Sequence, residues 1–287
     1  MNSRLQRTTL ALLACGAISV AHPAEATLVV NLTDNPLALA QAIFGSGITI
    51  TGTPTLSSQP GQSGTFTGFD SGPYSQTGGS FGRYTIPSGV ILSTGVASSA
   101  TGTYTGGGSA DLGGNGSPVL SALSGTPTFD AVVLTTQFTS ANPTVFLNYA
   151  FASAEYPASI GSFGDPFAIF VNGTNVALVP GTTVPVSINS VNAGVNSSFF
   201  TQYSDPTTPF NYGGITTLLT ASANVSTTAV NTIQFTIADA VDGNVDSAVL
   251  IQGGSSTSVP EPVGLLLLAT GLALLGGCTA ARGKAQA

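Results

Sequence analysis

The feature that most constrains the fold of this chain is a series of short segments in which apolar and polar residues alternate. In NTIQFTIA, residues 231–238, Ile233, Phe235 and Ile237 fall on one face, and threonine and glutamine fall on the other. The same alternation runs through TVFLNYAF, residues 144–151. A period of two residues is typical of a β-strand with one buried face. These segments are therefore predicted to be half-buried strands.

Ten runs of this kind, rich in β-branched and aromatic residues, are separated by Gly, Pro, Asn and Ser. They cover residues 47–51, 90–94, 131–138, 144–152, 167–171, 176–179, 184–188, 215–223, 232–238 and 247–252. Between the two ends of the chain, only residues 36–44 have apolar residues spaced as on a short helix. Many strands with almost no helix between them favour an all-β fold, an antiparallel sandwich or jelly-roll-like domain, over a parallel α/β sheet.

The N-terminal segment, residues 1–26, has the organisation of a secretory signal peptide. Two arginines precede an apolar run, residues 8–21, and the small-x-small motif AEA ends at Ala26. Lipid attachment at Cys15 is an alternative, but only about five apolar residues would then follow the basic start, which is short for this class of signal. We expect a signal helix that is removed on export.

Charge and cysteine content exclude several classes of protein. Only 6% of the residues are charged, against about 25% in an ordinary soluble domain. Residues 27–258 contain ten acidic side chains and one basic side chain, Arg83. A surface that binds nucleic acid needs several Lys or Arg residues, so this class is excluded. The same segment has no cysteine, so it has no disulfide framework.

The side chains that usually carry catalysis are nearly absent. The one histidine, His22, lies in the predicted signal, and the one lysine, Lys284, lies near the C-terminus. A Ser or Thr nucleophile needs a neighbouring base, and a transition-metal site prefers His or Cys ligands. Between residues 27 and 258 only carboxylate chemistry is left. We therefore expect a protein that is not an enzyme.

The acidic residues gather in two stretches, FASAEYPASIGSFGDPFAIF at 151–170 and ADAVDGNVDSAV at 238–249. The DGNVD run places oxygen side chains at every second residue, a spacing that a tight loop can converge on a hard cation such as Ca²⁺. A helix-loop-helix calcium motif is rejected, because Ser247 and Gly253 stand where Gly and Glu are required. A calcium site in a β-loop and a simple Asx turn both stay open. The candidate ligands are Glu155, Asp165, Asp239, Asp242, Asn244 and Asp246, with Ca²⁺ as the candidate cofactor.

Glycoside hydrolysis would need two carboxyl groups about 5 Å or about 6.5–9.5 Å apart. Glu155 and Asp165 form the one pair that we can nominate. The chain has no tryptophan on which a sugar ring could stack. A carboxylate-based glycoside hydrolase therefore ranks last, behind a calcium-dependent carbohydrate-binding module.

The C-terminal segment, residues 257–287, contains an apolar run of a different kind. Residues 263–281 carry no charge and are just long enough to cross a bilayer. Arg282 and Lys284 follow this run and would stay inside by the positive-inside rule. A core helix is the less favoured alternative, because the run has no polar face. We expect a C-terminal transmembrane helix.

The triplet Pro260, Glu261 and Pro262, the apolar run and the basic end together resemble a PEP-CTERM sorting signal. This signal belongs to Gram-negative bacteria that make exopolysaccharide. The resemblance implies recognition by an exosortase in the inner membrane, with cleavage near the triplet during surface delivery.

The body of the chain resembles the choice-of-anchor L domain of surface proteins. The similarity lies in GVILSTG at 89–95, NYAFASAEYP at 148–157, GDPFAIFVNGTNVALVPGTTVPVSINSVN at 164–192 and IADAVDGNVDSAVLIQGGS at 237–255. The family typically has an acid where this chain has Ala154, and a hydrophobic residue where it has Pro166. The resemblance implies one β domain over residues 27–256, in which we expect Gly/Ser/Thr-rich loops over 57–125.

These observations favour an exported surface or extracellular-matrix protein that acts in adhesion or in association with exopolysaccharide and biofilm. Its expected partners are an exosortase, extracellular polysaccharide and cell-surface components. We expect a transient inner-membrane intermediate, followed by the cell surface or extracellular matrix of a Gram-negative bacterium.

Overall fold

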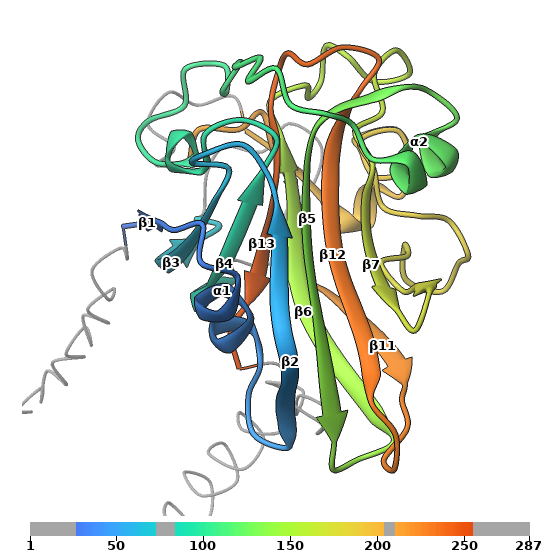
Figure 1. Cartoon of the computed structure of the whole chain (residues 1–287). Coiled ribbons are helices and arrows are strands. Elements are labelled where there is room, and N and C mark those ends of the chain that lie inside the picture. Colours follow the sequence, from blue (N-terminus) through green and yellow to red (C-terminus); the bar gives the residue numbers. More distant parts are fainter. Residues whose placement is uncertain (1–26, 73–83, 204–209, 255–287) are drawn as a thin grey trace, which may run out of the picture.

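The computed structural model describes residues 27–72, 84–203 and 210–254, which form two antiparallel sheets packed face to face (Figure 1). The predicted all-β antiparallel fold is confirmed. The predictions of a signal helix at 1–26 and of a sorting tail with a transmembrane helix at 257–287 lie outside the described residues. Within the described ranges, no helix combines the length and the apolar character needed to cross a membrane.

The larger sheet has eight strands: β1 (Val29–Leu32), β3 (Ser63–Asp70), β4 (Thr85–Ser93), β6 (Thr144–Ser153), β9 (Phe200–Gln202), β10 (Gly214–Thr216), β11 (Leu219–Asn224) and β13 (Ser247–Gln252). Their order is β1-β3-β4-β13-β6-β10-β9, and β11 also pairs with β6. The smaller sheet has five strands, β2 (Ile48–Ser57), β5 (Thr128–Ser140), β7 (Phe167–Val171), β8 (Thr174–Asn175) and β12 (Asn231–Ala240). Their order is β2-β5-β12-β7-β8.

Two short α-helices, α1 (Pro36–Ile43) and α2 (Pro118–Ser124), and two 3-10 turns, η1 (Ala97–Ala100) and η2 (Ser197–Phe199), complete the described elements. Helix α1 begins where the sequence predicts, because the Asn35 side chain accepts hydrogen bonds from two backbone N–H groups of the first turn and a proline follows it. Its buried residues Leu39 and Ile43 belong to the main core. Helix α1 thereby covers the core beside β2 and β4 (Figure 1).

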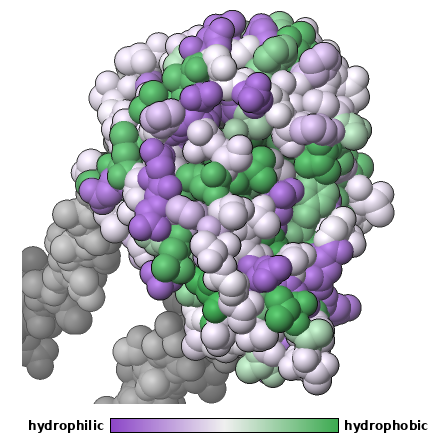
Figure 2. Space-filling view, in the orientation of Figure 1, coloured by the Kyte–Doolittle hydropathy of each residue, from purple (hydrophilic) through white to green (hydrophobic). Residues whose placement is uncertain are grey.

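The main core lies between the sheets. Ile233, Phe235 and Ile237 on β12 face the other sheet, where alternate residues of β6 and β13, including Leu147 and Val249, are also buried. Fully burying one such side chain contributes about 1.5–3 kcal/mol relative to leaving it in water. The outer face drawn in Figure 2 is mostly of intermediate hydropathy, with hydrophobic and hydrophilic residues interspersed. The alternation in the sequence therefore marks the core correctly.

Three local predictions are wrong. Residues 176–179 and 184–188 form no strands and meet only through the isolated bridge between Leu178 and Pro185, because two prolines in this stretch lack the N–H that a ladder needs.

Residues 215–223 form two strands instead of one. The Thr216 hydroxyl accepts the Phe151 N–H at 3.0 Å and so takes the place of a backbone partner at the break.

The third correction concerns residues 57–125, which are not loops throughout. This stretch contains β3, all of β4 and the helix α2, whereas the sequence predicted only 90–94 as a strand there. Gly89 on β4 lies close to the neighbouring strand, because a Cβ there would lie 1.9 Å from the Ile251 carbonyl oxygen. The small residue thus allows β4 and β13 to approach closely.

Candidate functional site

At one end of the sandwich, the inward faces of the strands change from apolar to polar. On β12 the two-residue period that buries Phe235 and Ile237 continues to Asp239, and on β7 the period that buries Phe167 extends back to Asp165. Both carboxyl groups are therefore directed to the interior, and each residue is 1% exposed. This is the upper end of Figure 1, where β12 ends and β7 begins.

The eight-stranded sheet makes the same change at this end. Thr94 follows the buried Leu92 with the same period, Ser153 ends β6, and Ser247 begins β13; all three are fully buried. We call the set of Thr94, Ser153, Asp165, Asp239 and Ser247, with the adjacent Glu155 and Asp246, the polar layer. It closes the hydrophobic core at this end.

Asp165 is held by hydrogen bonds from two directions. The Ser247 hydroxyl donates to Oδ2 at 2.7 Å, and the Ala240 N–H donates to Oδ1 at 2.8 Å. Burial raises the pKa of Asp165 to about 7, and these two hydrogen bonds act in the opposite direction. Since Ser247 lies on the other sheet, the contact joins the two layers of the sandwich.

Asp239 has no such support. Neither of its carboxylate oxygens has a hydrogen-bond partner among the described residues. Burial, and then the charge of Asp165, raise the pKa of Asp239 to about 10. The Thr94 hydroxyl lies close enough to lower that pKa, without reaching standard hydrogen-bond geometry. Asp239 is thus a buried acid with two unpaired oxygens.

Glu155 and Asp246 each leave one oxygen unpaired within the described part. Glu155 Oε2 has no partner, and burial followed by the charges of Asp165 and Asp242 raises the Glu155 pKa to about 9. Asp246 Oδ1 accepts the Ala110 N–H at 3.0 Å, while Oδ2 has no partner. Burial raises the Asp246 pKa to about 6, against the effect of the Ala110 bond.

The DGNVD run forms a turn of the Asx type. Asp242 is half-buried, and its Oδ1 accepts the Asn244 N–H at 3.0 Å; Asn244 is exposed. The structure therefore brings four of the candidate ligands together as buried acids, and leaves Asn244 at the surface. In the ranges that the structure describes, no group of three or more His, Cys, Asp or Glu side chains is already arranged around a metal position.

Asp130 is a buried acid that sequence reasoning missed. Its backbone φ is 46°, at an irregularity in the pairing of β5 with β12. Its carboxylate accepts the Leu112 N–H at 2.9 Å and also the Gly114 N–H, and its carbonyl accepts from the Gln62 amide at 2.8 Å. The signal for it was a lone acid inside the apolar strand TFDAVVL. Asp130 holds the loop before α2 against the end of the sandwich.

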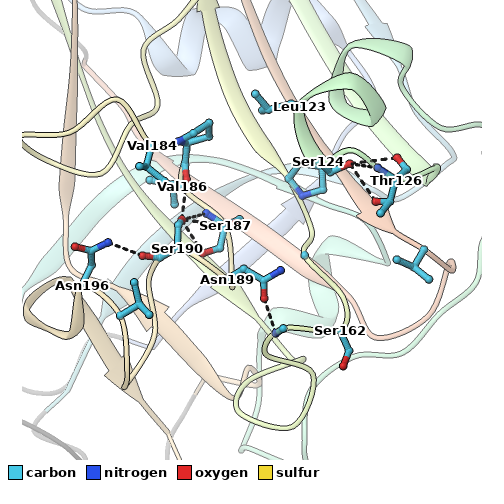
Figure 3. A pocket seen from close by; sticks show the side chains of 16 residues that line it. Leu123, Ser124, Thr126, Ser162, Val184, Val186, Ser187, Asn189, Ser190 and Asn196 are labelled. Carbon is cyan, nitrogen blue, oxygen red and sulfur yellow. Dashed lines mark hydrogen bonds between the residues drawn. The ribbon is translucent and has the colours of Figure 1, made fainter.

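A pocket of about 540 Å³ adjoins the polar layer. Figure 3 shows the residues that line it. Gly164 and Pro166, the two neighbours of Asp165, form part of its wall, and so does Val241, next to Asp242. None of the residues that line the pocket is charged. The polar members of the lining are Ser124, Thr126, Ser162, Ser187, Asn189, Ser190 and Asn196.

Hydrogen bonds within the lining fix some of its polar groups and leave others open. Asn189 Oδ1 accepts the Gly161 N–H at 2.6 Å, and the Asn196 amide donates to the Ser190 carbonyl at 2.8 Å (Figure 3). Asn189 Nδ2 and Asn196 Oδ1 make no hydrogen bond within the described part. The pocket therefore offers one amide donor and one amide acceptor.

The model of the choice-of-anchor L domain family matches residues 30–257. The chain belongs to this family. No curated protein and no solved structure matches the chain. Membership of the choice-of-anchor L family indicates an extracellular or cell-surface protein. The polar layer and the pocket both lie within the matched residues.

In this choice-of-anchor L domain, the pair nominated for glycoside hydrolysis is buried and does not line the pocket. Glu155 is 3% exposed, Asp165 is 1% exposed, and neither lines the pocket. Ala154, which precedes Glu155, is also buried. The two carboxyl groups therefore face the interior, and the uncharged pocket beside them faces solvent.

Proposed function

We propose that the chain is a non-enzymatic surface or extracellular-matrix protein that binds a neutral polysaccharide in the pocket beside the polar layer. The observation that carries this proposal is the chemistry of the lining, in which hydroxyl and amide groups alternate with short apolar side chains and no charge is present. Sugar hydroxyls both donate and accept hydrogen bonds, and the C–H faces of a sugar ring contact apolar groups. The lining has no charged side chain with which a charged ligand could form an ion pair.

The exposed side chains around the pocket support the same ligand class. Val184, Val195 and Val241 are 45%, 48% and 44% exposed, and all three belong to the lining. They provide apolar contact area next to the amides of Asn189 and Asn196. A mixed surface of this kind suits a flat sugar ring whose edges are polar.

The proposal includes the route to the surface. Pro260, Glu261 and Pro262, followed by the uncharged run 263–281 and by Arg282 and Lys284, support sorting by an exosortase from an inner-membrane intermediate. The protein would then act in adhesion or in association with exopolysaccharide and biofilm. Its other partners would be cell-surface components.

A calcium-dependent carbohydrate-binding module is the second candidate. It is favoured by one observation, that residues flanking Asp165 and Asp242 form part of the pocket wall. A bound cation could then hold the pocket loops in place. A glycoside hydrolase is not proposed, because Glu155 and Asp165 are buried away from the pocket.

The test is glycan binding by the exported protein, purified after export by its own host. It is applied to an array of neutral glycans and to the exopolysaccharide of the producing cells. Asn189→Asp removes the Nδ2 donor but keeps the oxygen that accepts the Gly161 N–H. We expect this variant to bind roughly fivefold to tenfold more weakly, the value of one hydrogen bond.

The matched control is Asn224→Asp, which makes the same exchange at an exposed position on β11. Its binding should equal that of the wild type. Absence of binding to every glycan and to the exopolysaccharide, or equal binding by Asn189→Asp, would overturn the proposal. Release of new reducing ends from the polymer would overturn its non-enzymatic part.

A further inference from the structure

The unpaired polar atoms of the interior are concentrated in the polar layer. Across the described residues, the buried side-chain atoms without a hydrogen-bond partner are Thr51 Oγ1, Tyr149 OH, Glu155 Oε2, Asn175 Nδ2, Thr236 Oγ1, both Asp239 Oδ atoms and Asp246 Oδ2. Half of these are carboxylate oxygens at one end of the sandwich. Buried polar groups almost always have a partner, so this concentration marks the polar layer as a candidate ligand site.

No basic side chain of the described part can neutralise these acids. Residues 27–72, 84–203 and 210–254 contain no Lys, Arg or His. A buried carboxylate without a counter-charge is costly, so it either takes up a proton or binds a cation.

Protons would satisfy these carboxyl groups only in part. A protonated carboxyl becomes an O–H donor and then needs an acceptor. Neither Asp239 oxygen makes a hydrogen bond among the described residues, although the Thr94 hydroxyl lies close to this carboxyl group. A cation, in contrast, neutralises the charge and uses the free lone pairs at the same time.

The ligand atoms of the polar layer are all oxygen. They are carboxylates and the hydroxyls of Thr94, Ser153 and Ser247, without any nitrogen or sulfur side chain. Hard cations such as Ca²⁺ prefer this set, whereas transition metals prefer His and Cys. Ca²⁺ also accepts variable coordination numbers and completes its shell with water, hydroxyl and backbone oxygens.

We infer that the polar layer binds one divalent cation of the Ca²⁺ type at Asp239, with Asp165 as the second carboxylate. Two carboxylates balance the charge of one such ion. The site therefore needs only two acids, which is compatible with the absence of a group of three or more among the described residues. The remaining ligands would be neutral oxygens and water. The ion would lie between the two sheets, behind the pocket wall, instead of in the Asx turn from Asp242 to Asn244.

The inference does not depend on the proposed polysaccharide binding, because its test contains no glycan. The full exported chain is stripped with EDTA and dialysed, and it is then titrated with CaCl₂ or MgCl₂. Bound calcium is measured by mass spectrometry, and stability is measured by thermal unfolding. We expect one Ca²⁺ per chain, with weaker Mg²⁺ binding. At about 100 times the dissociation constant, the unfolding equilibrium should shift about 100-fold, or roughly 2.7 kcal/mol.

The decisive variant is Asp239→Asn, which keeps the shape of the side chain and removes its charge. We expect calcium affinity to fall by more than about 100-fold. Loss of a residue that only supports a metal ligand lowers affinity by up to about 100-fold, so a larger loss identifies Asp239 as a direct ligand. Without calcium, this variant should be at least as stable as the wild type, because the amide needs neither a proton nor a counter-ion to be neutral. Asp34→Asn, at an exposed acid after β1, is the control and should respond to calcium as the wild type does.

Lack of any calcium-dependent stabilisation of the wild type at millimolar Ca²⁺ would overturn the inference. A response that Asp239→Asn retains would also overturn it, by placing the ion elsewhere. If Asp239→Asn does not fold, Asp165→Asn is measured in its place, and the calcium content of the wild type decides independently whether an ion is bound.

Discussion

The Ser247 hydroxyl donates a 2.7 Å hydrogen bond to Asp165 Oδ2, and this buried contact joins the two sheets where the hydrophobic core ends. Ser247→Ala should therefore destabilise the fold by about 1–3 kcal/mol, because Asp165 loses a partner that cannot be replaced by water. Urea unfolding measures the change. Ser222→Ala, at an exposed position of β11, should stay within about 0.5 kcal/mol of the wild type. An equal effect of both substitutions would contradict the role of the contact.

A second buried hydrogen bond connects the polar end to the pocket loops. The Tyr156 hydroxyl donates to the Val191 carbonyl at 2.6 Å, and Tyr156 is 2% exposed. Tyr156→Phe leaves this carbonyl unpaired, so we expect a loss of about 1–3 kcal/mol and weaker glycan binding. Tyr104→Phe, at a half-buried tyrosine, is the control. Unchanged stability of Tyr156→Phe, measured by thermal and urea unfolding, would exclude this connection.

The cation-free protein should become less stable as pH rises. Burial raises the pKa of Asp246 to about 6, of Asp165 to about 7, of Glu155 to about 9 and of Asp239 to about 10, against ordinary values of 3.8 or 4.5. Above about pH 4, the folded state therefore holds more protons than the unfolded state. Its stability is greatest at low pH and is lost as pH rises through these values.

Urea unfolding in EDTA between pH 5 and pH 9 tests this expectation. Saturating Ca²⁺ should oppose the loss, because the ion binds the ionised carboxylates. Stability in EDTA that increases across this interval would show that the buried acids are ionised and compensated in another way.

The tail prediction concerns residues outside the described ranges. If Pro260, Glu261 and Pro262 mark a processing site, the exported protein should lack residues 264–287, and the cell-associated precursor should contain them. Intact-mass measurement of both fractions decides this. A substitution of Glu261 should retain the longer form in the membrane fraction. Exported protein that carries the whole tail would refute the processing.

Local pattern was sufficient to place the central strands. Alternation in 231–238 and 144–151 depends on the two-residue period of an extended chain, and this period is a property of each segment by itself. Strands β3 and β9 lie outside the predicted runs, because they are rich in glycine or short and are stabilised by their neighbours. The predicted strands at 176–179 and 184–188 fail for a related reason, since apolar content alone does not supply the N–H groups that proline removes.

The sequence by itself determined the oxygen-rich, cation-poor chemistry of this protein and the period that gives each strand a buried face. Only the tertiary structure decided which acids share one interior. Ser247 and Asp165 are 82 residues apart, and their contact exists because β13 and β7 lie on facing sheets. The spacing of DGNVD predicts a cation site in a loop. Packing of the second sheet instead buries Asp239. The two-residue period that places Ile237 in the core also directs the next inward residue, the acid Asp239, to the interior.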